Sequence, residues 1–169
     1  MAGLRRLAEL LRAEGGILAQ LALPLDGEAP AAGPGAVAAS GPRAAGREGE
    51  YELFVETIYE GFLLHYATPR LLRRTTTPAL KVLAGDRLYA LGLARLVALG
   101  DITAVQEMAD VLTIGASAYA VGNGELAEAV WWAGARAIGW GPTADHRRAK
   151  TLALAGDPEA LAAFHKCLP

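Results

Sequence analysis

The sequence predicts an all-α protein, and three observations support this fold class. The chain has 169 residues, a length that suits one domain. Hydrophobic residues make up 53% of it and aromatic residues only 7%, because alanine and leucine, both good helix formers, dominate the apolar content. β-branched residues are sparse and never alternate with polar residues over the length of a strand. These features predict a single orthogonal or antiparallel bundle of six or seven helices.

The first 49 residues predict two different segments. Residues 1–23 contain an amphipathic helix over about 4–13, because Leu4, Leu7, Leu10 and Leu11 fall on one face and glycines at 15 and 16 end it. Residues 24–49 are rich in alanine, glycine and proline and carry no large apolar anchor after Leu25 except Val37. This composition predicts a flexible linker that proteases should cut.

Residues 50–169 predict an all-α helical domain. Helices are expected over about 50–67, 78–99, 102–121, 125–139, 143–155 and from 157 onward. Gly100 ends the second of these, and Asp101 can cap the next one. Thr143 opens a further helix, and Pro158 after Asp157 opens the last.

Composition excludes several classes of function. The net charge is -2, so no basic surface is available for nucleic acid. The most apolar stretch, 80–99, contains Asp86, Arg87 and Arg95, so no membrane span is expected. Cys167 is the only cysteine and can form neither an internal disulfide nor a zinc cluster. A reducing cytoplasm is the simplest location for such a chain.

Few residues suggest chemistry. The three histidines, His65, His146 and His165, are far apart, and none has a second ligand at helical spacing, so they are interpreted as surface or helix-end residues. No catalytic motif, metal site or cofactor-binding loop is predicted. The one basic cluster is either a solvated junction between helices or an anion site for phosphate oxygens. Its members are Arg70, Arg73, Arg74 and Lys81.

The apolar helix over 78–99 contains an unusual pair, Gly85 and Asp86. Glycine costs about 1 kcal/mol relative to alanine in a helix interior. A buried carboxylate costs more unless it is paired. The interpretation is structural: Gly85 lets a neighbouring helix approach closely, and Asp86 is buried and accepts hydrogen bonds.

The stretch "VLAGDRLYALGLARLVALGD" and the following "ITAVQEMADVLTIGASAYAVGNGE" resemble the all-trans polyprenyl diphosphate synthases over about 78–125. The resemblance is carried by three pairs, Gly85 with Asp86, Gly100 with Asp101, and Gly124 with Glu125. That family holds magnesium against an allylic diphosphate with an Asp-Asp-x-x-Asp motif. Here the corresponding residues 65–70 read HYATPR, and the only aspartates after Glu125, where the family carries its second aspartate-rich motif, are the isolated Asp145 and Asp157.

The resemblance therefore implies the aspartate-poor small subunit of a two-chain synthase. Such a chain would be a non-catalytic partner subunit that assists product-length control in isoprenoid quinone side-chain synthesis, with no activity of its own. Its partner would be the catalytic subunit or a second copy. The alternatives are a helical scaffold protein without prenyl chemistry and a binder of small apolar ligands. The faces expected to bind a partner carry Phe54, Ile58 and Phe62, or Leu88, Leu91 and Leu96.

Overall fold

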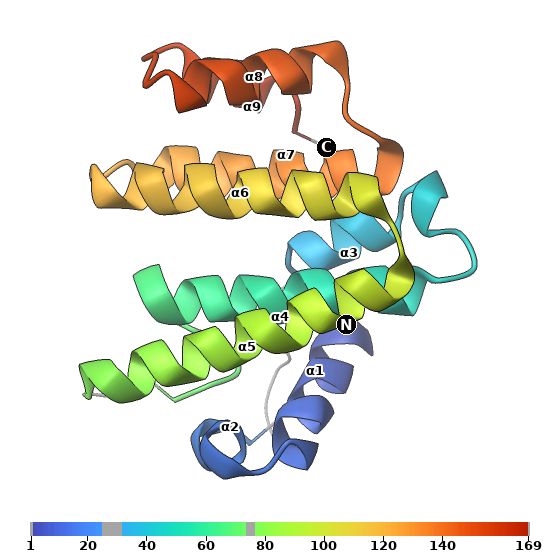
Figure 1. Ribbon diagram of the computed structural model, residues 1–169, viewed down its shortest axis with the longest axis vertical. Helices are drawn as coiled ribbons and strands as arrows, with labels where there is room; N and C mark the ends of the chain where they lie inside the picture. The colour runs from blue at the N-terminus through green and yellow to red at the C-terminus, as the bar shows by residue number, and fades with distance from the viewer. Residues whose placement is uncertain (1, 25–31, 74–76, 169) are drawn as a thin grey trace. The chain divides into compact units, whose positions relative to one another are not determined.

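The computed structural model describes residues 2–24, 32–73 and 77–168, and these residues form an all-α fold (Figure 1). They contain nine α-helices, more than the six or seven expected, together with one 3-10 helix and a single isolated β-bridge. The helices are α1 (Ala2–Ala13), α2 (Gly16–Leu21), α3 (Pro34–Ala39), η1 (Pro42–Ala44), α4 (Glu48–Tyr66), α5 (Pro78–Leu99), α6 (Ile102–Ala120), α7 (Gly124–Trp140), α8 (Ala144–Leu154) and α9 (Ala160–His165). The predicted fold class is confirmed.

The chain forms two compact units. The first unit comprises Met1–Ala36 and Gly49–Leu99, and the second comprises Val37–Glu48 and Gly100–Pro169. The division between α5 and α6 falls at Gly100, which has a φ of 68° and so adopts a conformation that favours glycine. Asp101 caps α6 by accepting a hydrogen bond from the Ala104 N–H at 3.1 Å, as predicted.

The first unit has a leucine-rich core shared by α1, α2, α4, α5 and the segment after α4. Its buried members are Leu4, Leu7, Ala8, Leu11, Leu18, Leu21, Leu53, Leu64, Leu71, Leu72, Ala84 and Leu88. An antiparallel bridge between Ala22 and Leu72 ties that segment to the end of α2. The Leu23 N–H donates to the Leu71 carbonyl at 2.9 Å, and the Arg73 N–H donates to the Leu21 carbonyl at 2.8 Å.

Glycines allow α4 and α5 to pack closely within the first unit. A Cβ atom at Gly92 would lie 3.2 Å from the Phe54 carbonyl oxygen, and one at Gly61 would lie 3.1 Å from the Gly85 carbonyl oxygen. The buried stripe of α5 consists of Ala84, Gly85, Leu88, Gly92 and Leu96. Small side chains on this stripe bring the two backbones together, and the larger ones fill the space beside them.

This packing corrects the expected partner-binding faces. Phe54, Ile58, Phe62, Leu88 and Leu96 are at most 1% exposed, and Leu91 is half-buried. They are core residues, so the prediction that they form an uncovered face is wrong. Periodicity marked them as apolar but could not say which apolar face of each helix points inward.

In the second unit α7 packs against α6, α9 and η1, and α8 packs against α9 and α6. Local capping explains where these helices begin. The Asn123 side chain accepts a hydrogen bond from the Leu126 N–H at 3.0 Å, and Thr143 Oγ1 accepts one from the His146 N–H at 3.1 Å. The predicted start of a helix at Thr143 is confirmed.

Part of the predicted linker is helical and packed. Within 24–49, residues 34–39 and 42–44 form α3 and η1, while residues 25–31 lie outside the described residues. Ala38 and Ala44 are fully buried. Gly41 lies directly against the backbone of Gly139 in α7. The prediction of a chain without regular structure is therefore wrong for 34–44, because glycine and alanine pack backbone against backbone and need no large apolar anchor.

Candidate functional sites

The Gly85–Asp86 pair lies on α5 opposite His65 of α4. A Cβ atom at Gly85 would lie 2.5 Å from His65 Nε2, so the absent side chain makes room for the imidazole ring. Asp86 is 62% exposed, and its Oδ1 lies 3.2 Å from His65 Nε2 without hydrogen-bond alignment. The prediction that Asp86 is buried is wrong, because one residue of helical rotation carries it from the buried stripe to the solvent side.

We expect Gly85→Ala to lower the free energy of unfolding by about 1–3 kcal/mol, since overpacking costs this much in a well-packed interior. The His65 ring has little room to move, because it stacks on Tyr89 with ring centroids 5.1 Å apart. Asp86→Ala is the matched control and should change stability by less than about 1 kcal/mol, as for an exposed ion pair. Urea denaturation of both variants measures the difference, and equal effects would contradict this account.

Arg70 occupies the centre of a buried ionic cluster in the first unit. Its Nη2 donates to Glu56 Oε2 at 2.6 Å and its Nε to Glu60 Oε2 at 3.3 Å. Glu60 Oε1 also accepts the backbone N–H groups of Arg70 and Leu71 at 2.8 and 2.7 Å. Glu56 Oε1 accepts the Gly35 N–H at 2.9 Å. Both carboxylates are almost fully buried, at 1% and 0% exposure.

Burial and pairing oppose each other in this cluster. Burial raises the pKa of Glu60, although Arg70 and the two backbone N–H groups lower it in part. Desolvation disfavours the charge on Arg70, but the carboxylates of Glu56 and Glu60 outweigh it and raise the pKa of the guanidinium. The Arg70 guanidinium also lies over the Tyr59 ring, 4.8 Å from its centroid. The cluster stabilises the fold of the first unit, because the charges of Arg70, Glu56 and Glu60 are paired with one another.

In the part of the chain that the structure describes, the predicted basic cluster is therefore not assembled as an anion site. Arg70 is neutralised by two carboxylates, so it has no charge to offer a phosphate. The Arg73 side chain is exposed, Lys81 is half-buried, and Arg74 lies outside the described residues. The overlooked signal in the sequence is Glu56 and Glu60, two acids four residues apart in the mostly apolar stretch 53–64 of α4.

The magnesium site of the prenyl synthases does not fit this chain. Residues 65–70 supply no carboxylate, and the nearest acids on α4, Glu56 and Glu60, are held by Arg70. Among the described residues no three histidine, cysteine, aspartate or glutamate side chains are grouped so that they could hold a metal ion.

A second buried ionic cluster links α6 to α8 in the second unit. Glu107 Oε2 lies 2.8 Å from His146 Nε2, and Glu107 Oε1 accepts a hydrogen bond from Lys150 Nζ at 2.7 Å. Lys150 Nζ also donates to Asp110 Oδ2 at 2.7 Å. Burial opposes the charge on Glu107, but His146 and Lys150 prevail and lower its pKa. Glu107 is thus ionised at neutral pH, and its two oxygens pair with Lys150 and with the His146 ring.

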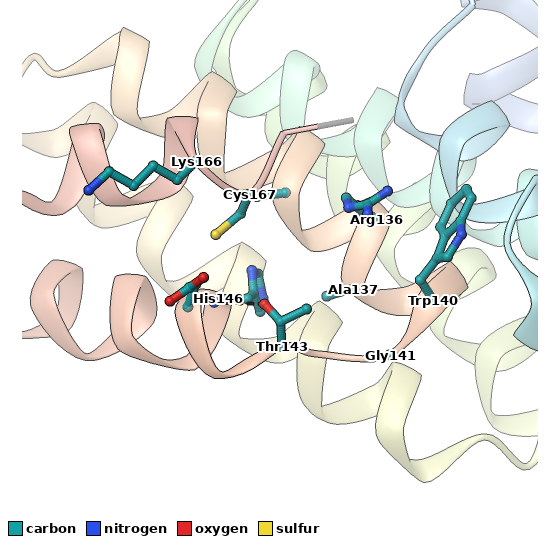
Figure 2. A pocket seen from close by; sticks show the side chains of 10 residues that line it. Arg136, Ala137, Trp140, Gly141, Thr143, His146, Lys166 and Cys167 are labelled. Carbon is teal, nitrogen blue, oxygen red and sulfur yellow. Dashed lines mark hydrogen bonds between the residues drawn. The ribbon is translucent and has the colours of Figure 1, made fainter.

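A cavity of about 340 Å³ opens beside this cluster (Figure 2). Its walls come from the end of α7, the start of α8 and the C-terminal residues. Among the residues that line it are Arg136, Trp140, Asp145, His146, Lys166 and Cys167. The prediction that His146 is a surface or helix-end residue is wrong with respect to burial, because its side chain is 4% exposed.

Cys167 is a weak nucleophile in this cavity. Burial and the Asp145 carboxylate raise the pKa of its thiol, and Arg136 only partly offsets them. Its Sγ donates to the Ala163 carbonyl oxygen at 3.4 Å. The thiol is therefore protonated at neutral pH.

Fold and sites together define a helical protein with two compact units, each stabilised by a buried ionic cluster. No known protein family, curated protein or solved structure matches the chain. In the part of the chain that the structure describes, no helix is both long enough and apolar enough to cross a membrane.

Proposed function

We propose that the chain is a non-catalytic partner subunit of a polyprenyl diphosphate synthase and that α5 binds the catalytic subunit. The observation that carries this proposal is the outward side of α5, here called the α5 outer face. It is formed by the exposed residues Val82, Leu83, Ala90, Leu93, Ala94 and Val97. These residues lie on one side of the helix in two groups, Val82 and Leu83 before the charged Asp86 and Arg87, and Ala90, Leu93, Ala94 and Val97 after them.

The α5 outer face is unusually apolar for a surface. Leu83 and Val97 are 59% and 70% exposed, and Val82 and Leu93 are also open to solvent. Two charged residues share this side of the helix, and both engage the first unit itself: Asp86 lies beside His65, and Arg87 donates to Glu14 Oε2 at 2.6 Å. Several large apolar side chains exposed on one side of a helix are typical of a protein-binding surface.

The position of this face supports the prenyl-synthase proposal. It lies on the helix that carries the Gly85–Asp86 resemblance, opposite the buried stripe that packs on α4. The acids of α4 stabilise Arg70 and do not converge on an open site. These features favour an auxiliary role over independent catalysis, with product-length control in quinone side-chain synthesis as the proposed consequence of pairing.

Mixing the purified chain with the catalytic prenyl diphosphate synthase of the same organism tests the proposal. We expect a stable complex with a changed product length, and no magnesium-dependent prenyl transfer by the chain alone. The triple variant Leu83→Glu/Leu93→Glu/Val97→Glu should weaken the complex by about 100-fold or more, because it places charges in the centre of the interface. Isothermal titration calorimetry measures this loss.

The matched control introduces three glutamates at exposed apolar positions of the second unit, Ile102, Val121 and Leu154. This control variant should bind like the natural chain. If the chain forms no complex with any such synthase, the proposal is overturned and the scaffold alternative is favoured. Magnesium-dependent prenyl transfer by the chain alone would overturn both the partner-subunit proposal and the scaffold alternative.

A further inference from the structure

We infer that a groove between α7 and the end of α9 binds the guanidinium group of an arginine side chain from a protein partner. This groove, here called the α7–α9 groove, has a volume of about 550 Å³ and lies wholly within the second unit. Its lining residues are Glu125, Glu128, Ala129, Trp132, His165 and Leu168. None of them belongs to the α5 outer face, so the inference is independent of the proposed function.

The first observation is an accessible aromatic ring. Trp131 and Trp132 are adjacent on α7, but Trp131 is 1% exposed, whereas Trp132 is half-buried and lines the groove. Ala129 and Leu168 are the other apolar residues of the lining. An accessible indole ring is the best aromatic partner for a cation, and a guanidinium plane can stack on its face.

The second observation is negative charge on the same side of α7. Glu125, Glu128 and Trp132 are separated by three and four residues, so they share one face of the helix. Neither glutamate forms an ion pair with another described residue. No described arginine or lysine lines the groove, because Arg136, one turn after Trp132, lies over the Trp140 ring, 5.3 Å from its centroid. Charge complementarity therefore favours a cationic occupant.

The first unit already holds a guanidinium with the same three kinds of group. On α4, Glu56 and Glu60 pair with Arg70, and the Arg70 Cζ lies 4.8 Å from the centroid of the Tyr59 ring. Two carboxylates and one aromatic ring within two turns of a helix thus suffice to bind an arginine side chain. The α7–α9 groove presents two carboxylates and one aromatic ring at the surface, where an arginine of another protein can reach them.

A guanidinium matches this groove better than an ammonium does. Its face can stack on the indole ring while its N–H edge donates to a carboxylate, whereas an ammonium is a compact, strongly hydrated charge without a planar face. The size of the groove favours an arginine that is part of a polypeptide. Pockets of about 300–1,000 Å³ hold drug-sized molecules. A groove in this range therefore has room for the main chain beside the arginine as well.

Titration of the full chain with the capped peptide acetyl-Gly-Arg-Gly-amide tests the inference. The signal is the indole N–H resonance of Trp132, which is assigned by its absence in Trp132→Phe. The titration is run at pH 8, where histidine side chains are mostly neutral. We expect a saturable shift with a Kd in the millimolar range, because exposed ion pairs and stacking contacts are individually weak. The peptide acetyl-Gly-Lys-Gly-amide should bind about threefold more weakly or worse.

Two variants separate the contributions of charge and ring. Glu125→Gln/Glu128→Gln should raise the Kd by about fivefold, as for the loss of two exposed ion pairs. Glu9→Gln/Glu159→Gln makes the same change at exposed acids outside the groove and should leave the Kd within about twofold. Trp132→Leu should also raise the Kd by about fivefold, measured from the arginine resonances of the peptide.

Three results would overturn the inference. An indole resonance of Trp132 that does not move shows that the groove does not bind the peptide. Equal affinity for the lysine peptide, or a Kd unchanged by the Glu125→Gln/Glu128→Gln variant, shows that a guanidinium is not recognised between the carboxylates. Equal affinity for propylguanidinium and the arginine peptide assigns the groove to a free organic cation and overturns the protein partner.

Discussion

Arg70→Leu is expected to lower the free energy of unfolding by about 3–5 kcal/mol, because it leaves two buried carboxylates without their counter-ion. Glu56 and Glu60 are nearly inaccessible to water, and one guanidinium bridges both. Three backbone N–H groups still reach these carboxylates, but they carry no net charge. The loss should therefore approach the full cost of a broken buried ion pair.

The loss should depend on pH in a defined direction. The pKa of folded Glu60 already lies above the ordinary value of 4.5 because of burial, and removing Arg70 removes a group that lowers it. A group with a raised folded pKa contributes stability below its unfolded pKa, and this contribution disappears as the pH rises through the folded pKa. The variant should thus be weakest relative to the natural chain at neutral pH and recover part of the difference towards about pH 5.

Urea denaturation at several pH values measures both effects. Arg73→Leu is the matched control, since Arg73 is three residues away and its side chain is exposed. It should change stability by less than about 1 kcal/mol at any of these pH values. Equal losses for the two variants, or a loss at Arg70 that grows as the pH falls, would contradict the buried-cluster account.

The sequence was most informative about local features. Helix starts and ends depend on residues that lie next to each other, such as Gly100 followed by Asp101, or Thr143 three residues before the N–H that it caps. These signals placed α6 and α8 to within a residue or two. Composition also predicted the all-α class, because the abundance of helix-forming residues does not depend on long-range packing.

The inward face of α5 could not be found from periodicity, because both sides of that helix are apolar. Hydrophobic patterning identifies a buried face only when the opposite face is polar. The large residues Leu83 and Val97 are exposed, while Gly85 and Gly92 are buried. Here the small residues mark the contact, since they allow the helix backbones to approach.

The two ionic clusters depend on contacts that sequence spacing does not reveal. Glu107 and His146 are 39 positions apart, and Gly35 reaches Glu56 across 21. The sequence alone suggests that a histidine at the start of α8 is exposed. His146 is buried because α8 packs against α6, which carries Glu107. Glu56 and Glu60 of α4 were the one signal in the sequence for such a cluster, because carboxylates in an apolar stretch of a buried helix require a partner.

Gly139→Val should lower the free energy of unfolding by at least about 3 kcal/mol, at or beyond the upper end of ordinary overpacking. Gly139 is buried on α7, and a Cβ atom there would lie 2.5 Å from the Ala38 carbonyl oxygen and 3.2 Å from its Cα. These are backbone atoms, so no side-chain rotation can relieve the clash. Valine would add two methyl groups to the same space.

The same substitution at Gly124 is the control, because it lies at the start of α7 and a Cβ there would meet nothing within 4 Å. Gly124→Val should change stability by less than about 1 kcal/mol. Thermal or urea unfolding followed by tryptophan fluorescence reports on the second unit, where Trp131 is buried. A small, equal effect of both substitutions would mean that residues 37–48 do not pack on α7. The flexible linker predicted from composition would then be the correct description of that segment, because only a loosely held chain could move away from the new side chain.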